Sequence, residues 1–280
     1  MTSETDWLLA RTFAGTSGAV RWDRLGPPDG TPVVLLHGTP FSSYVWRGVA
    51  RALARDHQVF VWDMPGYGRS EKAAGQDVSL AAQGRVLTEL LAHWNLPEPL
   101  VAAHDIGGAV ALCAHLLHGA RYRALALVDP VALAPWGSPF FRLVREHAEV
   151  FGQLPPALHG ALVRAYISSA GGPGLRPDVL ERLVEPWLDV SGQAAFYRQI
   201  AQADQRHTDE IQGRYGDIGI PVLVCWGEED SWIPVAKGRE LAALVPGARF
   251  EPFAGAGHLV QEDAPAELVG ALLSFFAQVA

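Results

Sequence analysis

Short, continuous apolar runs recur along the chain and are separated by segments with helical periodicity. The apolar runs cover residues 32–36, 58–62, 100–103, 124–128 and 221–226. A strand that is buried on both faces produces such a run, and parallel sheets bury both faces of their strands. The helical patterns between them cover residues 43–54, 79–93 and 109–117. Strands that alternate with helices predict an α/β fold with a mostly parallel, doubly wound sheet.

This alternation is preceded by an expected hairpin, residues 11–14 and 19–25, and it stops after residue 130. From 131 to 217 helical patterns continue without a buried strand, and strand–helix order then resumes. We therefore expect a core domain made of residues 1–130 and 218–280. A helical cap domain, residues 131–217, is inserted after the sixth strand. Ligands bind at the carboxyl edge of open α/β sheets, so the cap is expected to cover that edge.

Composition narrows the class of protein. The 280 residues are 49% hydrophobic, carry a formal net charge of −8 and include no basic block. An acidic balance of this kind disfavours nucleic acid and anionic membrane surfaces as partners. The first residues lack the basic and apolar regions of a signal peptide, and no apolar stretch reaches the roughly 20 residues of a membrane span. We expect a cytoplasmic protein in which Cys113 and Cys225 are reduced core residues.

The stretch from Val101 to Ala109 carries the first candidate for chemistry. An apolar strand leads through His104-Asp105-Ile106-Gly107-Gly108 into an apolar helix. The two glycines allow strand and helix to approach closely, and the helix N-terminus favours a negative charge. A sharp turn of this kind presents one side chain at the edge of the sheet. The motif G-x-S-x-G places a serine there, whereas this chain places Asp105.

Two further reactive residues follow later strands. Asp230 ends the loop Gly227-Glu228-Glu229-Asp230, and His258 ends the loop Gly255-Ala256-Gly257-His258. The carboxyl ends of parallel strands meet at one edge of a sheet, so the three side chains are expected to converge. Nucleophile, acid and histidine also follow one another in the chain order of α/β-hydrolases.

With these residues the chain resembles the α/β-hydrolase superfamily over nearly its whole length. The motifs His37-Gly38-Thr39-Pro40 and His104-Asp105-Ile106-Gly107-Gly108 are similar to the branch that uses an aspartate nucleophile. That branch contains epoxide hydrolases, haloalkane dehalogenases and haloacetate dehalogenases. The resemblance implies an α/β-hydrolase fold with a helical cap, and a hydrolase that acts on an sp³ carbon.

The chemistry explains why an aspartate serves here. A carboxylate with a reference pKa of about 4 is ionised at neutral pH and needs no base to attack carbon. The product of that attack is an ester on Asp105. His258 is expected to activate the water that hydrolyses the ester, and Asp230 to orient His258. The backbone N–H groups of Thr39 and Ile106 are the candidate oxyanion donors by motif position.

Several plainer interpretations remain open at this point. Asp105 and His258 can be ordinary loop residues, and Asp230 can belong to an exposed acidic loop. Asp129 is an alternative to Asp230 as the acid that orients His258, because one dehalogenase subgroup places this acid after the strand that follows the nucleophile. His115 and His118 lack the H-E-x-x-H pattern, so no metal site is expected, and the mechanism requires no cofactor.

The leaving group depends on residues of the cap. Similar dehalogenases hold the halide with two N–H donors, one of them a tryptophan directly after the nucleophile, where this chain has Ile106. Epoxide hydrolases instead protonate the epoxide oxygen with two cap tyrosines. Tyr197, in Ala195-Phe196-Tyr197-Arg198-Gln199, is the candidate acid, and Tyr166 is a weaker substitute for the second tyrosine. Epoxide hydrolysis to a diol is therefore preferred over dehalogenation of haloalkanes or haloacids.

An apolar pocket suits a small hydrophobic substrate, with water as the second reactant. The expected substrate contacts are His37, Phe41, Trp136, Phe140, Trp187 and Tyr166. A third hypothesis, of a different class, is a binding or biosynthetic protein on the same scaffold, because one fold hosts many functions. The sequence leaves both a monomer and a homodimer open.

Overall fold

The computed structural model describes residues 7–172 and 174–279, and these form one eight-stranded sheet. The strand order is β1-β2-β4-β3-β5-β6-β7-β8. The strands are β1 (Arg11–Gly15), β2 (Gly18–Leu25), β3 (Thr31–Leu36), β4 (His57–Trp62), β5 (Leu100–His104), β6 (Ala124–Val128), β7 (Val222–Gly227) and β8 (Arg249–Phe253). The β1–β2 hairpin joins β4 in antiparallel orientation, and β3 to β8 pair in parallel. The predicted α/β-hydrolase fold class is confirmed.

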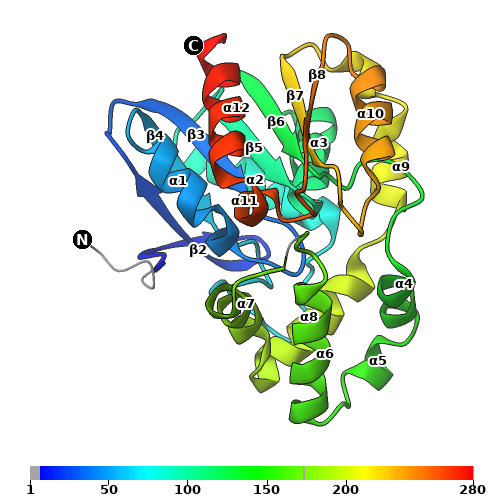
Figure 1. Ribbon diagram of the computed structural model, residues 1–280. Helices are drawn as coiled ribbons and strands as arrows, with labels where there is room; N and C mark the ends of the chain where they lie inside the picture. The colour runs from blue at the N-terminus through cyan, green and yellow to red at the C-terminus, as the bar shows by residue number, and fades with distance from the viewer. Residues whose placement is uncertain (1–6, 173, 280) are drawn as a thin grey trace.

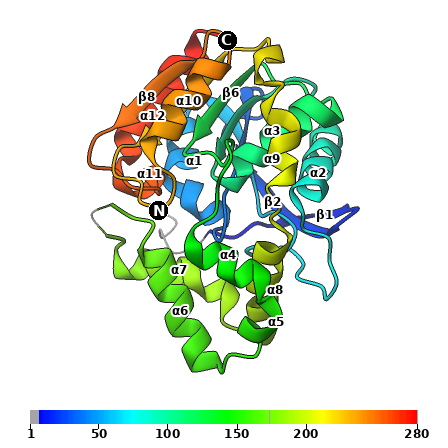
Figure 2. The ribbon, with the colours of Figure 1, turned by 90° about the vertical axis from the view of Figure 1, so that its right-hand side faces the viewer.

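Every residue of β5, β6 and β7 is buried. These strands lie in the middle of the sheet with helices on both of its faces, which accounts for their continuous apolar runs. Helices α1 (Arg47–Leu53) and α12 (Pro265–Ala277) pack together on one face, and α2 (Leu80–His93) and α3 (Ile106–His118) cover the other (Figures 1 and 2). Helix α10 (Val235–Leu244) packs on β7 and β8, and the short α11 (Val260–Asp263) precedes α12.

A second layer of helices lies beneath the sheet in Figure 1. It consists of α4 (Pro139–Glu146), α5 (Ala148–Phe151), α6 (Pro156–Ser168), α7 (Pro177–Val184) and α8 (Val190–Gln202). These helices form the cap, and the chain enters it directly after β6.

Helix α9 (Arg206–Gln212) lies outside this layer, although the sequence assigned it to the cap. It packs on α3 at the level of the sheet (Figure 2). The Cys113 thiol on α3 lies 3.6 Å from the backbone oxygen of His207 on α9. The chain therefore returns to the core layer before residue 218.

Cys113 and Cys225 are both buried and unbonded to each other. Among residues 7–172 and 174–279, no helix combines the length and the apolar character that crossing a bilayer requires.

Candidate active site

Asp105 occupies the turn between β5 and α3 in a backbone conformation that side chains rarely adopt. Its φ is 52° and its ψ is −124°. Such a conformation costs on the order of 1–3 kcal/mol and persists where the surroundings impose it. Here the Asp105 N–H donates to the Val128 oxygen at 3.1 Å, and the Asp105 oxygen accepts from Val131 at 3.0 Å. A Cβ on Gly107 would lie 2.4 Å from the His37 oxygen, so this position requires glycine.

The two oxygens of the Asp105 carboxylate have different partners. Oδ1 accepts a hydrogen bond from the Thr39 N–H at 2.7 Å, while Oδ2 lies 3.3 Å from Nε2 of His258. The Ile106 N–H also bonds to the carboxylate. Burial raises the pKa of Asp105, but the interactions with His258 and with the Ile106 N–H outweigh burial and hold this pKa below its ordinary value. Asp105 is therefore an ionised, buried carboxylate.

His258 lies between two carboxylates and is fully buried. Its Nδ1 donates to Oδ2 of Asp230 at 2.8 Å. Burial lowers the pKa of His258, but the charges of Asp230 and Asp105 raise it well above its ordinary value. Asp230 itself is buried, unlike the exposed Glu228 and Glu229 beside it. Its Oδ1 accepts the N–H groups of Trp232 and Ile233 at 2.7 and 2.9 Å. The acidic loop thus directs one carboxylate inward to His258.

A small cavity of about 40 Å³ lies against Asp105, beneath the cap. Besides Asp105, the lining residues with a hydroxyl group are Thr39, Ser138 and Tyr166, and the rest of the wall is mainly apolar. The apolar lining consists of Ile106, Val131, Trp136, Phe141, Trp232 and Ile233. Two buried carboxylates, a histidine and a mainly apolar cavity thus meet at the carboxyl edge of the sheet.

Comparison with known proteins identifies the family of the chain. The family model of the alpha/beta hydrolase fold matches residues 31–265. This chain belongs to the α/β-hydrolase family. A crystal structure of an alpha/beta hydrolase fold protein from Burkholderia ambifaria is 48% identical, with a TM-score of 0.92 over 95% of this hydrolase and 97% of that chain.

Two curated relatives are more distant from this hydrolase. The dihydrolipoyllysine-residue acetyltransferase component of the acetoin cleaving system of Pseudomonas putida is 27% identical over 91% of this chain. The match spans 66% of that longer protein. Haloalkane dehalogenase 2 of Mycobacterium bovis is 24% identical over 95% of this chain and 94% of its own length.

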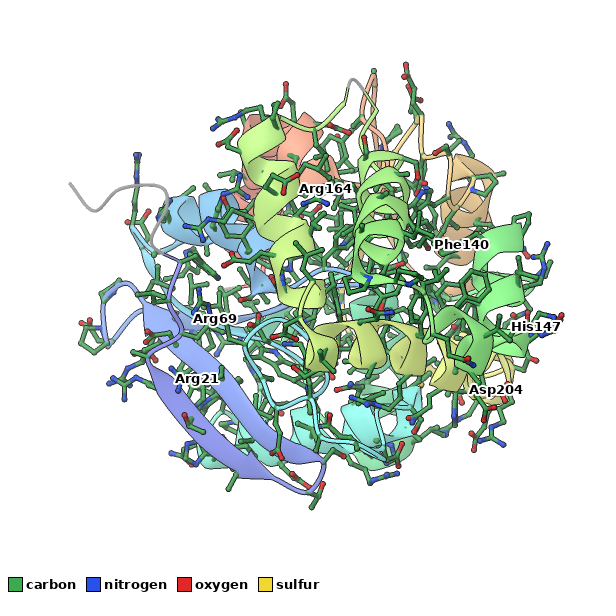
Figure 3. The ribbon with its side chains drawn as sticks, turned by 90° about the horizontal axis from the view of Figure 1, so that it is seen from below. Arg21, Arg69, Phe140, His147, Arg164 and Asp204 are labelled. Atoms are coloured by element: carbon green, nitrogen blue, oxygen red, sulfur yellow. The ribbon has the colours of Figure 1, made fainter. Side chains whose placement is uncertain are left out.

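Of the substrate contacts expected from the sequence, Trp136 and Tyr166 line the cavity of the hydrolase. The other four are not among its lining residues, and each makes other contacts. Trp187 is buried, and its Nε1 donates to the Pro40 oxygen at 2.8 Å. Phe41 packs on the rings of His104, Trp232 and His258. Phe140, on α4 (Figure 3), packs on the ring of Tyr166, with 4.7 Å between the ring centroids.

His37 holds the loop that contains Thr39 and does not line the cavity. It is fully buried and both ring nitrogens are used. Nδ1 donates to the Gly38 oxygen at 2.9 Å, and Nε2 accepts from the Met64 N–H at 2.9 Å. Burial lowers the pKa of His37, in keeping with this neutral form. The residue holds the loop that delivers the Thr39 N–H.

Tyr197 does not line the cavity, in contrast to its assignment as the proton donor. Its hydroxyl lies 2.8 Å from Nδ1 of His159, whose Nε2 donates to the Trp187 oxygen at 2.8 Å. Helix α8 thus turns Tyr197 toward α6, and this contact ties two cap helices together.

Tyr166 lines the cavity instead, and its ring stacks on Trp232 at 4.5 Å between centroids. Burial and the Asp105 charge raise the pKa of Tyr166, while a hydrogen bond with Ser138 acts in the opposite direction. Its phenol therefore keeps its proton at neutral pH.

Three supporting residues escaped the sequence analysis. Two of them are Tyr67 and Gln199. Thr39 Oγ1 lies 2.6 Å from the Tyr67 hydroxyl and 2.7 Å from Oε1 of Gln199, so a core loop and α8 of the cap meet beside Thr39.

The third is His104, which donates through Nε2 to the backbone oxygen of His258 at 2.9 Å. Burial lowers the pKa of His104 to about 3, so it is neutral. His104 thereby holds the loop that contains His258.

Gly38→Ala is expected to displace the Asp105 carboxylate. A Cβ at Gly38 would lie 2.4 Å from Cβ and 2.5 Å from Oδ1 of Asp105, so either the loop or the carboxylate must move. A shift of this size costs roughly 10²-fold in turnover. Gly48→Ala, in α1, is the matched control, because nothing lies within 4 Å of its Cβ and alanine favours a helix. Turnover and denaturant unfolding of both variants check this, and full activity in Gly38→Ala would contradict it.

Proposed function

We propose that this hydrolase opens epoxides of small hydrophobic molecules through an ester on Asp105 and releases a diol. One observation carries the proposal. An ionised carboxylate occupies the nucleophile position, with an N–H donor on one oxygen and His258 3.3 Å from the other. A carboxylate attacks an sp³ carbon without prior deprotonation, whereas a serine requires a base for the same step.

In the first step Oδ2 of Asp105 attacks an epoxide carbon, and the carbon–oxygen bond of the ring breaks. The epoxide oxygen takes the proton of the Tyr166 hydroxyl, which leaves a hydroxyalkyl ester and a phenolate. In the second step a water gives a proton to His258 and attacks Cγ of Asp105. The Thr39 and Ile106 N–H groups stabilise the oxyanion on Oδ1.

Collapse of that intermediate expels the diol oxygen, which takes the proton from His258. The Asp105 carboxyl then loses its own proton, which restores the Tyr166 hydroxyl. The sum of the steps is one epoxide and one water converted to one diol.

Ester formation also prepares His258 for its task. In the free protein the Asp105 charge is among the interactions that raise the pKa of His258. Alkylation removes this charge, so the pKa of His258 falls in the ester. A lower pKa favours the neutral imidazole, which is the form that accepts a proton from water.

The cap favours an epoxide over a halide as the leaving group. A halide needs free N–H donors, and Ile106 has no donor in its side chain. The indole N–H groups of Trp136, Trp187 and Trp232 donate to Thr208, Pro40 and Ser169, at 2.7, 2.8 and 3.0 Å. By contrast, Tyr166 lines the cavity, and its phenol keeps its proton at neutral pH.

The proposal is tested by a panel of epoxides and haloalkanes, assayed for diol and for halide. An active compound is then taken through a single turnover in ¹⁸O-labelled water with excess enzyme. The solvent oxygen is expected in the peptide that contains Asp105, and the product oxygen comes from the protein. Label found directly in the product would mean that water attacks the substrate itself. Halide release without diol formation from epoxides would make the protein a dehalogenase, and an inert panel would favour a binding protein.

A further inference from the structure

Asp129 is a buried carboxyl group with no role in the steps above. It follows β6, has a φ of 43°, and is fully buried. Its Oδ1 accepts the Gly227 N–H at 2.9 Å. Its Oδ2 has no donor among the residues that the structure describes. The Oδ2 atom of this buried carboxyl group therefore accepts no hydrogen bond from the described part of the chain and is free to carry a proton.

The neighbours of Asp129 explain which carboxyl holds that proton. Polar atoms of Asp129, Asp230 and His258 lie within 4.8 Å of one another. Two carboxylates at this separation in a buried site do not both ionise. Asp230 receives three N–H donors, from His258, Trp232 and Ile233, whereas Asp129 receives one. Hydrogen bonds stabilise the ionised form, so the charge resides on Asp230 and the proton on Asp129.

We propose that Asp129 is a positioning residue whose carboxylic acid donates a hydrogen bond to the Asp230 carboxylate, and so fixes the acid that orients His258. The titratable groups that face Asp129 are Asp230, His258 and the Cys225 thiol. Burial and the Asp230 charge raise the pKa of Asp129 well above its ordinary value, which agrees with this assignment.

The hydrogen bond has a consequence for the base. The hydrogen bond that Asp129 donates withdraws negative charge from the Asp230 carboxylate and restrains the Asp230 side chain. His258 then feels a weaker negative charge, and its pKa is lower than it would be beside an unrestrained Asp230. Loss of the donor should keep His258 protonated to higher pH. This consequence rests on the proposed function, since it takes His258 as the base of ester hydrolysis.

The proton on Asp129 is tested without any substrate. Infrared spectra of the protein at neutral pH should contain the carbonyl band of a protonated carboxyl group. The band should disappear in Asp129→Asn and persist in Asp77→Asn, which alters an exposed aspartate. A spectrum in which Asp129→Asn removes no such band would overturn the proposal, whatever the protein acts on.

Stability supplies a second substrate-free measurement. Between the ordinary carboxyl pKa of about 4 and the raised pKa of Asp129, the folded protein binds one proton more than the unfolded chain. The free energy of unfolding therefore falls as pH rises through this window. Asp129→Asn should remove that contribution, so its unfolding free energy should fall less with pH than that of the wild type. Equal slopes would contradict a protonated Asp129.

The positioning role is tested by the pH dependence of ester hydrolysis in a single turnover. Asp129→Ala removes the donor, and its half-maximal rate should move to higher pH by about one unit, a tenfold lower rate near neutrality. Asp129→Asn keeps an N–H donor for Asp230 and should restore most of that shift. Identical profiles for wild type and Asp129→Ala would overturn the positioning role. If no ester forms on Asp105 with any compound, the proposed function fails while the infrared result still decides the state of Asp129.

Discussion

A His258→Gln variant is expected to accumulate the ester on Asp105 and to turn over roughly 10⁴-fold more slowly than the wild type. The substitution removes the group that takes the proton from water. It leaves the nucleophile and the Thr39 N–H in place, so attack on the substrate still occurs. Burial of Asp105 shields the ester from bulk water, and the intermediate should therefore persist.

Intact mass measures this directly. After incubation with an active epoxide, His258→Gln should gain the mass of the whole epoxide. After incubation with a haloalkane, an active dehalogenase would gain only the alkyl group and release halide. Asp105→Asn combined with His258→Gln is the control and should gain no mass. An adduct in this double variant would place the nucleophile elsewhere, and Asp105→Asn with intact natural activity would make Asp105 structural.

The second large effect is expected at the cap. Tyr166→Phe should slow ester formation from an epoxide by about 10³-fold, within the range for general acid catalysis. The phenylalanine keeps the stacking on Trp232 but has no proton for the opening ring. Tyr197→Phe should keep ester formation near the wild-type rate, because its hydroxyl lies against His159. Its effect should instead be a loss of about 1 kcal/mol of stability, the usual worth of a buried hydrogen bond.

Stopped-flow measurement of ester formation in the two variants separates the two tyrosines. A substrate that opens without acid assistance, such as a haloalkane that the protein accepts, should be insensitive to Tyr166→Phe. If Tyr197→Phe slows epoxide opening more than Tyr166→Phe does, then α8 rather than α6 supplies the proton, and the arrangement of the cap must change when substrate binds.

Local sequence was sufficient for the part of the site that depends on short segments. The turn around Asp105 needs small residues where strand and helix touch, and a Cβ on Gly107 or Gly108 would meet atoms at 2.4 and 2.5 Å. Such crowding appears directly as glycine in the sequence. Asp230 and His258 follow parallel strands, and strand ends converge because of the topology of the sheet. For these reasons the fold class and the convergence of Asp105, Asp230 and His258 could be predicted from the amino-acid sequence alone.

Only the tertiary structure decided which cap side chains reach the nucleophile. Periodicity predicts that α6 and α8 are helices, but the face that each presents depends on packing between helices distant in sequence. That packing places the Tyr197 hydroxyl beside His159 and places Tyr166 in the wall of the cavity. It also places α9 on α3, and it places Asp129 against Asp230, 101 positions later in the chain. The amino-acid sequence determined the residues of the turn and the alternation of strands and helices, whereas contacts between remote segments determined which tyrosine lines the cavity and which acid lies beside Asp230.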